Sequence, residues 1–509
     1  MNRIYIDGNH LTIEEVHQAS LGGAYVEIHE SALEPIEKSR KFLEEKLKED
    51  RAHYGINTGF GDFAGVRISH QDLARLQINL VRSHSAGVGE KLPVEVVRAM
   101  MVLRANALCR GNSGVRREVI ETLLEMYNKR IYPVVPSRGS VGASGDLAPL
   151  AHIALAMIGE GEVEYAGEIV PAREALVQNQ ITPVILQEKE GLALINGTQL
   201  MTAIGCIALA QMERLMKTAD ALAALTVEVL LGTDKSFIPQ IQQARPHQGQ
   251  IDTAENMLKL LKNSEIIESH RNCKKVQDPY SLRCIPAVHG AVRESMEFAR
   301  KIFTTEINSS VDNPLLFPDE DLIVSGGNFH GAPVAIALES LAVALSFTAN
   351  ISERRTERMV NHHYSDLPPF LTRDGGLNSG FMIAQYTAAA LASENKVLCH
   401  PACCDTIPTS AGQEDHVSMG SISALKLKQI LENTWHVLAV EALCAAQARE
   451  FHEGKECGEG TRVVFESIRQ KVPFMAVDRA VGKDILTVLS IIKDEGFMNN
   501  IEEKTGNLR

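Results

Sequence analysis

Apolar residues recur at intervals of three and four over five long stretches in the C-terminal part of the chain. The stretches cover residues 197–231, 287–305, 332–360, 381–400 and 417–452. This spacing places the apolar side chains on one face of a helix, and several stretches exceed the usual helix length of a globular protein. Long helices rich in Ala and Leu predict a central bundle, in which each helix buries its apolar face against its neighbours.

The N-terminal part has shorter helical patterns that alternate with turns and a few short strands. Helical spacing covers residues 31–50, 69–87, 93–108, 116–130 and 147–158. Thr12 to Glu15 has the sequence of a capping box, and short apolar runs predict hairpins at 162–170 and 315–324. We therefore expect a mainly α-helical protein, with a mixed, mostly helical N-terminal lobe (1–200) and a long-helix bundle with C-terminal helices (201–509).

Composition excludes several classes of partner. The 509 residues carry a net charge of −13, which argues against nucleic acid because no basic face can neutralise phosphates. The most apolar run, 200–231, is interrupted by Gln211, Glu213, Arg214, Lys217 and Asp220, so it predicts a buried helix and not a membrane span. The first residues lack the apolar core of a signal peptide, and nine scattered cysteines suit reduced thiols. We expect a cytoplasmic protein with no membrane partner.

One group of metal-ligating residue types is present, at Cys399, His400, Cys403 and Cys404. A structural zinc site needs paired ligands from a second segment at regular spacing, and no such segment is found. We interpret these cysteines as buried free thiols and expect no metal.

A glycine-rich stretch from Ser137 to Leu150 has a different character from the rest of the chain. Gly139, Gly142 and Gly145 recur at intervals of three, which suits a backbone that folds back tightly on itself. A helical pattern follows, with Asp146 as its predicted N-cap. An anion-binding turn is one interpretation, but the Gly-Lys-Ser/Thr ending of a phosphate loop is missing and no clear strand precedes the stretch.

The tripeptide Ala143-Ser144-Gly145 permits another chemistry. If the nitrogen of Gly145 attacks the carbonyl carbon of Ala143, a five-membered ring closes, and loss of water from the ring and from Ser144 leaves an electrophilic methylene. The string Gly-Ser-Val-Gly-Ala-Ser-Gly-Asp-Leu-Ala-Pro-Leu at 139–150 resembles that of the ammonia-lyases that make 4-methylidene-imidazol-5-one (MIO) from an internal Ala-Ser-Gly. The resemblance extends over essentially the whole chain. It implies autocatalytic MIO formation and an ammonia-lyase or fumarase-like fold. The fumarase-like enzymes themselves are a competing class, but their signature Gly-Ser-Ser-x-Met-Pro has no counterpart in this sequence.

The resemblance also implies roles for residues at matching motifs. These are Tyr54 as catalytic base, Asn196 beside the MIO ring, Tyr280 and Phe329 against the electrophile, Arg283 for the substrate carboxylate, Gln277 in the pocket wall and Glu414 for an imidazole. Each residue also has a structural interpretation. Tyr54 is then a loop tyrosine, Asn196 caps the following long helix, Arg283 pairs with a carboxylate, Phe329 is a core residue, and Glu414 lies at a helix N-terminus.

Substrate choice depends on two places in the sequence, the pair Ser83-His84 and Glu414. Ser83-His84 occupies a segment where relatives acting on phenylalanine or tyrosine carry Phe-Leu or His-Leu, and with Glu414 it is similar to the histidine-specific branch. The resemblance therefore implies conversion of L-histidine to trans-urocanate by a homotetramer whose active sites are shared between subunits. Departures from the family pattern are Ala411-Gly412, Cys403-Cys404, His289 and Gly331-Ala332. They leave open another aromatic amino acid as substrate. A 2,3-aminomutase is the alternative outcome, because elimination and amino migration differ in how long the product stays bound.

Overall fold

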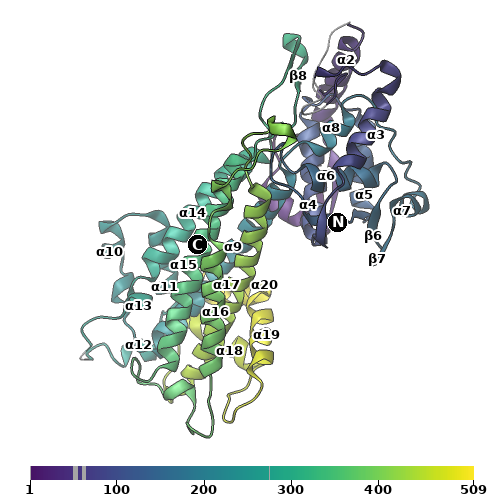
Figure 1. The fold of residues 1–509 in the computed structure, drawn as a ribbon. Helices are drawn as coiled ribbons and strands as arrows, with labels where there is room; N and C mark the ends of the chain where they lie inside the picture. The colour runs from purple at the N-terminus through teal and green to yellow at the C-terminus, as the bar shows by residue number, and fades with distance from the viewer. Residues whose placement is uncertain (1, 50–54, 60–64, 274) are drawn as a thin grey trace. The chain divides into compact units, whose positions relative to one another are not determined.

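The computed structural model describes residues 2–49, 55–59, 65–273 and 275–509. It is mainly α-helical, as the periodicity predicts (Figure 1). The helices are α1 (Ile13–Ser20), α2 (Leu33–Lys46), α3 (Leu73–His84), α4 (Val94–Cys109), α5 (Arg117–Asn128), α6 (Leu147–Met157), α7 (Ala172–Gln178), α8 (Glu190–Ile195), α9 (Gln199–Val229), α10 (Pro239–Ala244), α11 (Gln248–Leu260), α12 (Glu265–Glu268), α13 (Tyr280–Arg283), α14 (Ile285–Glu306), α15 (Ala332–Val360), α16 (Met382–Leu398), α17 (Gly420–Arg449), α18 (Glu459–Arg469), α19 (Val481–Ile492) and α20 (Glu495–Thr505).

Short strands pair in four places. They are β1 (Asn2–Ile6), β2 (Ala24–Ile28), β3 (Val88–Lys91), β4 (Tyr132–Pro133), β5 (Pro136–Arg138), β6 (Glu162–Tyr165), β7 (Glu168–Pro171), β8 (Leu315–Phe317) and β9 (Leu322–Val324). β1 and β2 pair in parallel, whereas the β3–β5, β4–β6–β7 and β8–β9 pairings are antiparallel. Both predicted hairpins and the capping box at Thr12 are confirmed. β5 includes the first two residues of the glycine-rich stretch and ends just before Gly139, which corrects the expectation that no strand precedes the glycines.

The chain divides into two compact units. The first gathers residues 1–210, 299–339 and 401–425, and the second gathers 211–298, 340–400 and 426–509. The boundary falls within the four long helices α9, α14, α15 and α17.

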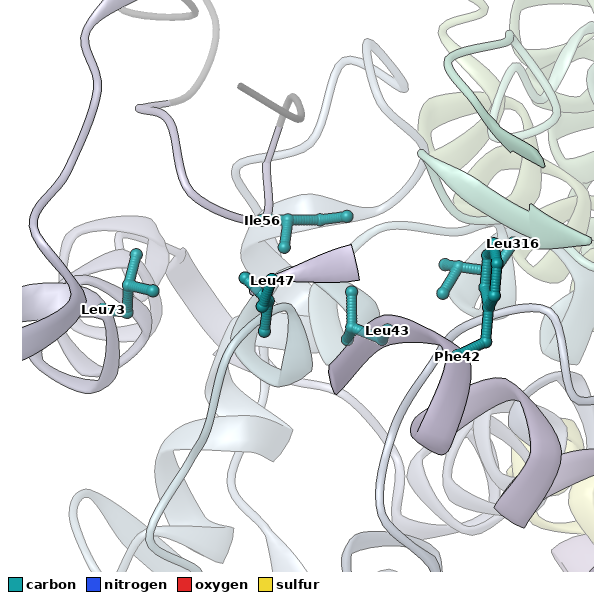
Figure 2. Close-up of a cluster of buried hydrophobic side chains, with 6 residues drawn as sticks. All are labelled: Phe42, Leu43, Leu47, Ile56, Leu73 and Leu316. Atoms are coloured by element: carbon teal, nitrogen blue, oxygen red, sulfur yellow. The ribbon is translucent and has the colours of Figure 1, made fainter. Parts of the chain in front are cut away.

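In the first unit, α4 is buried along most of its length, and α1 and α5 pack against it. A separate apolar cluster joins segments that are far apart in the sequence (Figure 2). It contains Phe42, Leu43, Leu47, Ile56, Leu73 and Leu316. Because Ile56 is fully buried in this cluster, the short segment 55–59 is anchored against α2 and α3.

Buried charges join the long helices of the second unit. The guanidinium of Arg355 on α15 donates to both carboxylate oxygens of Glu441 on α17, at 2.5 and 2.8 Å. The hydroxyl of Thr226 on α9 donates to the same carboxylate at 2.8 Å. Glu441 therefore joins three helices of the bundle. The positive charge of Arg355 compensates its negative charge at a buried position.

The helix α15 is long and apolar enough to cross a membrane, but 72% of its most apolar window is buried inside the structure. A buried apolar helix of this kind is a core element of the bundle, because its side chains already have apolar neighbours.

Candidate active site

A cavity of about 1230 Å³ lies within the first unit. Its lining includes Gly59, Val66, Ile68, Asn313 and residues from the last turns of α3, the glycine-rich stretch, α8 with Asn196 after it, the loop at 325–330 and the loop at 410–416. Seven residues proposed from the sequence share this lining, namely Ser83, His84, Ala143, Ser144, Asn196, Phe329 and Glu414. The fold thus gathers in one cavity residues that are separated by more than 300 positions.

The backbone of Gly145 lies very close to the backbone of a second segment at Gly197. Gly145 has φ of 73° and forms a parallel bridge with Gly197. The N–H of Asp146 donates to the carbonyl of Gly197 at 2.6 Å, and a Cβ on Gly145 would overlap that carbonyl. Only glycine fits here, since both the positive φ and the close approach exclude a side chain. The nitrogen of Gly145 therefore carries no neighbouring Cβ that could hinder its attack on Ala143.

The segment before α17 holds the other side of the turn. The N–H of Met419 donates to the carbonyl of Val141 at 2.9 Å, and the hydroxyl of Ser421 donates to the carbonyl of Ser140 at 3.1 Å. Val417 and Met419 also bury Ala143 in a small apolar cluster. The turn is consequently held from both sides by backbone hydrogen bonds.

Asp146 occupies the N-cap position of α6, as predicted, but its side chain makes no capping hydrogen bond to that helix. Its carboxylate instead accepts from the N–H groups of Leu200 and Met201, at 2.9 and 3.1 Å, and so caps α9. The side chain is fully buried, and this burial raises the pKa of Asp146 to about 7, although the two N–H groups act in the opposite direction.

Asn196 faces the Ala-Ser-Gly turn. Its amide donates to the carbonyl of Ser144 at 2.8 Å, and the long helix that follows begins at Gln199, two residues later than a cap at Asn196 requires. The buried guanidinium of Arg104 donates to the backbone carbonyl of Asn196 at 2.8 Å and to the side chain of Gln199 at 3.2 Å. Burial lowers the pKa of Arg104 to about 10, which still leaves the guanidinium charged at neutral pH.

Glu414 reaches the turn from the opposite wall. Its Oε1 accepts a hydrogen bond from the hydroxyl of Ser144 at 3.3 Å, and its Oε2 accepts one from the hydroxyl of Thr409 at 2.6 Å. The helix expected to begin at Val417 begins at Gly420, because the N–H groups of Ser418 and Met419 bind the glycine-rich stretch and Met419 has φ of 51°. Glu414 is therefore a loop residue and not part of a helix N-terminus.

His84 is half-buried at the end of α3. The carbonyl of Leu80 lies 2.9 Å from Nδ1, which assigns the proton of the neutral ring to Nδ1 and leaves Nε2 as an acceptor. Burial lowers the pKa of His84, while the Leu80 carbonyl and the Glu414 carboxylate oppose this shift. The ring is therefore neutral at pH 7.

Phe329 and His330 line the cavity on the loop before α15. The N–H of Ala332 donates to Nδ1 of His330 at 3.3 Å, and Nε2 of His330 contacts the carbonyl of His416 at 3.3 Å. His330 therefore connects the loop that carries Phe329 to the loop that carries Glu414.

The remaining proposed residues lie elsewhere. Gln277, Tyr280 and Arg283 belong to the second unit, where the guanidinium of Arg283 lies over the ring of Tyr280 at 4.6 Å from its centroid. Tyr280 is 72% exposed, so its ring is available to a partner. Tyr54 lies outside the described residues.

The cysteine group also differs in part from its interpretation. All nine cysteines are free thiols, but Cys399 and Cys403 are half-buried and Cys404 is exposed, so burial was predicted wrongly for this group. Within the described ranges, no three His, Cys, Asp or Glu side chains gather as metal ligands.

Sequence reasoning missed Arg104 and Thr409. Arg104 carried a weak signal, since it is a single charge in the apolar run of α4. Thr409 carried none, because its contact with Glu414 depends on a turn in which Ser410 and Ala411 have φ of 50° and 54°.

The chain is similar to known proteins over almost its whole length. The model of the family described as aromatic amino acid lyase matches residues 11–470. The chain is 52% identical over 507 residues to a histidine ammonia-lyase of Caldanaerobacter subterraneus subsp. tengcongensis. The aligned region covers 98% of this chain and 100% of that protein.

Two solved structures are similar over almost the whole chain. One is a histidine ammonia-lyase from Trypanosoma cruzi, with a TM-score of 0.91, 41% identity and coverage of 99% of this chain and 95% of that one. The other is a tyrosine aminomutase from Streptomyces globisporus, with a TM-score of 0.94, 37% identity and complete coverage of both chains.

We predict that Asp146→Asn changes how stability depends on pH. The folded carboxyl keeps its proton up to about pH 7, whereas an unfolded one loses it near pH 3.9. The wild-type free energy of unfolding should therefore lose up to about 1.4 kcal/mol per pH unit between these values, and the variant should lack this loss. Urea unfolding at pH 5, 6, 7 and 8 measures the free energy of unfolding at each pH. Asp366→Asn, at an exposed position, is the control. Parallel pH profiles for wild type and Asp146→Asn would contradict the assignment.

Proposed function

Because the chain belongs to the aromatic amino acid lyase family, we propose that it removes the amino group of L-histidine as ammonia and releases trans-urocanate. One observation carries the choice of substrate: the carboxylate of Glu414 approaches Ser144 within 3.3 Å, in the cavity that also contains the neutral His84. A carboxylate suits an imidazole, which can donate an N–H or carry charge. The 52% identity to a histidine ammonia-lyase supports the same substrate.

The proposed electrophile is MIO, formed from Ala143, Ser144 and Gly145 with loss of two waters. The residues present fit this group, since Gly145 has no side chain at the tight contact with Gly197 and Asn196 already donates to the carbonyl of Ser144. When formed, the group supplies an electrophilic methylene for the amino group of the substrate. The amide of Asn196 would remain directed at the ring, where it can stabilise negative charge.

The other proposed residues hold the substrate and move its proton. Glu414 accepts the imidazole N–H, and His84 and Ser83 complete the wall on that side. Arg283 grips the carboxylate through two parallel hydrogen bonds, which a lysine could not reproduce. In the proposed assembly, Gln277 would line the pocket wall and Tyr280 would pack against the electrophile from another subunit, whereas Phe329 already lines the cavity. Tyr54 removes the proton from the β-carbon of the substrate, for which its pKa must be tuned by its surroundings.

A 2,3-aminomutase or a lyase acting on tyrosine or phenylalanine is the second candidate, because a tyrosine aminomutase shares the fold with a TM-score of 0.94. The loop before α17 and the pair Ser83-His84 favour histidine. Incubation with each of the three amino acids separates the candidates. Ammonia and ultraviolet absorbance report deamination, and a β-amino acid detected by chromatography reports migration of the amino group.

We also propose a homotetramer in which active sites draw residues from several subunits, in the cytoplasm. Large apolar side chains remain exposed on the helices of the second unit, namely Val343 and Phe347 on α15 and Ile383, Tyr386 and Val397 on α16. Within the described part of the second unit these side chains have no cover, and an apolar surface of this kind is typical of an interface. The exposure of Tyr280 is consistent with a site completed by another subunit.

We predict that light scattering gives about four times the mass of one chain, since the apolar faces of α15 and α16 bury each other on assembly. Phe347→Asp should shift the enzyme to smaller species and lower its activity. The exposed Ile169→Asp on the β7 hairpin is the matched control and should leave the assembly intact. A fully active monomer would overturn the proposed assembly.

The mature protein should be about 36 Da lighter than its sequence, because the proposed ring closure and dehydration each release a water. Intact-mass spectrometry measures this directly. Ser144→Ala should keep the fold and the unmodified mass while losing most of the turnover. An active wild type with the full unmodified mass would rule out the proposed electrophile.

Glu414→Ala should lower kcat/KM for L-histidine about 10- to 100-fold, since a hydrogen bond to a charged group contributes about 1.5–3 kcal/mol. Activity on L-phenylalanine, or binding where turnover is absent, should change far less because a phenyl ring has no N–H to donate. Equal losses on both ligands would show that Glu414 does not recognise the imidazole.

A further inference from the structure

We propose that Thr409 is a positioning residue that orients Glu414 for the substrate imidazole, an inference that rests on the proposed function. Thr409 and Glu414 face each other across a closed turn. The N–H of each donates to the carbonyl of the other, at 3.0 and 3.3 Å, and the Thr409 hydroxyl donates to Oε2 of Glu414 at 2.6 Å. The backbone bonds close the turn, and the hydroxyl bond acts on the carboxylate.

The two carboxylate oxygens of Glu414 have separate partners. Thr409 binds Oε2, and the hydroxyl of Ser144 binds Oε1. A carboxylate is planar, so a partner that fixes Oε2 also fixes the direction of Oε1. The proposed loss of water from Ser144 removes the hydroxyl that occupies Oε1 and leaves Thr409 in place. Oε1 then points toward the reacting group with an acceptor site available for an imidazole N–H.

The contribution of the Thr409 hydroxyl can be separated from that of the turn. Thr409→Val keeps the shape of the side chain and both backbone hydrogen bonds and removes only the donor to Oε2. The Glu414 side chain is then free to rotate away. Substrate binding must then offset the entropy lost when this side chain is ordered. Thr409→Ser keeps the donor and should restore the wild-type behaviour. A residue that merely supports the fold would not distinguish Val from Ser in ligand binding.

Binding measured in the Ser144→Ala background tests the proposal without turnover. This variant lacks the hydroxyl at Oε1, as the mature site would, and cannot form the electrophile. Calorimetry with L-histidine should give a Kd about tenfold weaker for Ser144→Ala/Thr409→Val than for Ser144→Ala alone, which corresponds to about 1.4 kcal/mol. Thr409→Ser should stay within about twofold, and the Kd of L-phenylalanine should change little.

The control is Thr406→Val, in the same segment. The hydroxyl of Thr406 accepts from the N–H of Val417 at 2.9 Å and does not contact Glu414. This change should lower the unfolding temperature and leave the Kd of L-histidine within about twofold. If Thr406→Val weakens L-histidine as much as Thr409→Val, general loosening of the segment explains the effect and the proposal is overturned.

In the Ser144-containing enzyme, Thr409→Val should retain the 36 Da loss, because Thr409 acts on Glu414 and not on ring closure. Its kcat/KM for L-histidine should fall by the same factor as its affinity. Unchanged binding and kcat/KM in an enzyme that deaminates histidine would overturn the role of Thr409 alone. A wild type that does not deaminate histidine would instead overturn the proposed function, so the two failures are distinguishable.

Discussion

The candidate site depends on one backbone junction, where Gly145 and Asp146 run against Gly197. The carbonyl of Gly197 accepts from the N–H of Asp146, and the carboxylate of Asp146 caps α9 a few residues further on. These contacts fix the start of a long helix and the position of the Ala-Ser-Gly turn at the same time. A side chain on Gly145 would separate the two segments. Both the start of α9 and the position of the turn therefore require glycine at position 145.

Buried polar and ionisable groups around this junction act mainly on the backbone. Arg104 donates to the carbonyl of Asn196, and Asp146 accepts from two N–H groups of α9. Behind them, Lys189 at the start of α8 is fully buried and pairs with Asp312 at 2.6 Å. A buried charge is costly without a partner, so each of these groups keeps its segment in place through the penalty of losing that partner. This arrangement fixes the main-chain atoms of Ala143 and Gly145 that the proposed ring closure would join.

Helical periodicity predicted α15 to the residue, and short apolar runs predicted both hairpins, because those patterns are local. The errors arose where a distant segment decides the local structure. Residues before α17 have a helical pattern, but the N–H of Met419 binds Val141, and the helix begins only at Gly420. Asp146 has the sequence of an N-cap for α6, yet its carboxylate finds donors more than fifty positions away. Thr409 could not be found at all, since a turn with two positive φ angles at non-glycine residues brings it to Glu414.

The order of events at Glu414 follows from the same contacts. Before any ring closes, the Ser144 hydroxyl and the Thr409 hydroxyl each bind one of its oxygens, so the carboxylate is oriented while the turn is still an ordinary peptide. Ring closure and dehydration would consume the first donor and spare the second. The chemistry that creates the electrophile would then also free the acceptor that recognises the substrate, and recognition and reactivity would appear together. Loss of the Ser144 hydroxyl, by dehydration or by substitution, would therefore leave Oε1 with a further acceptor site for the imidazole N–H while Thr409 still orients the carboxylate.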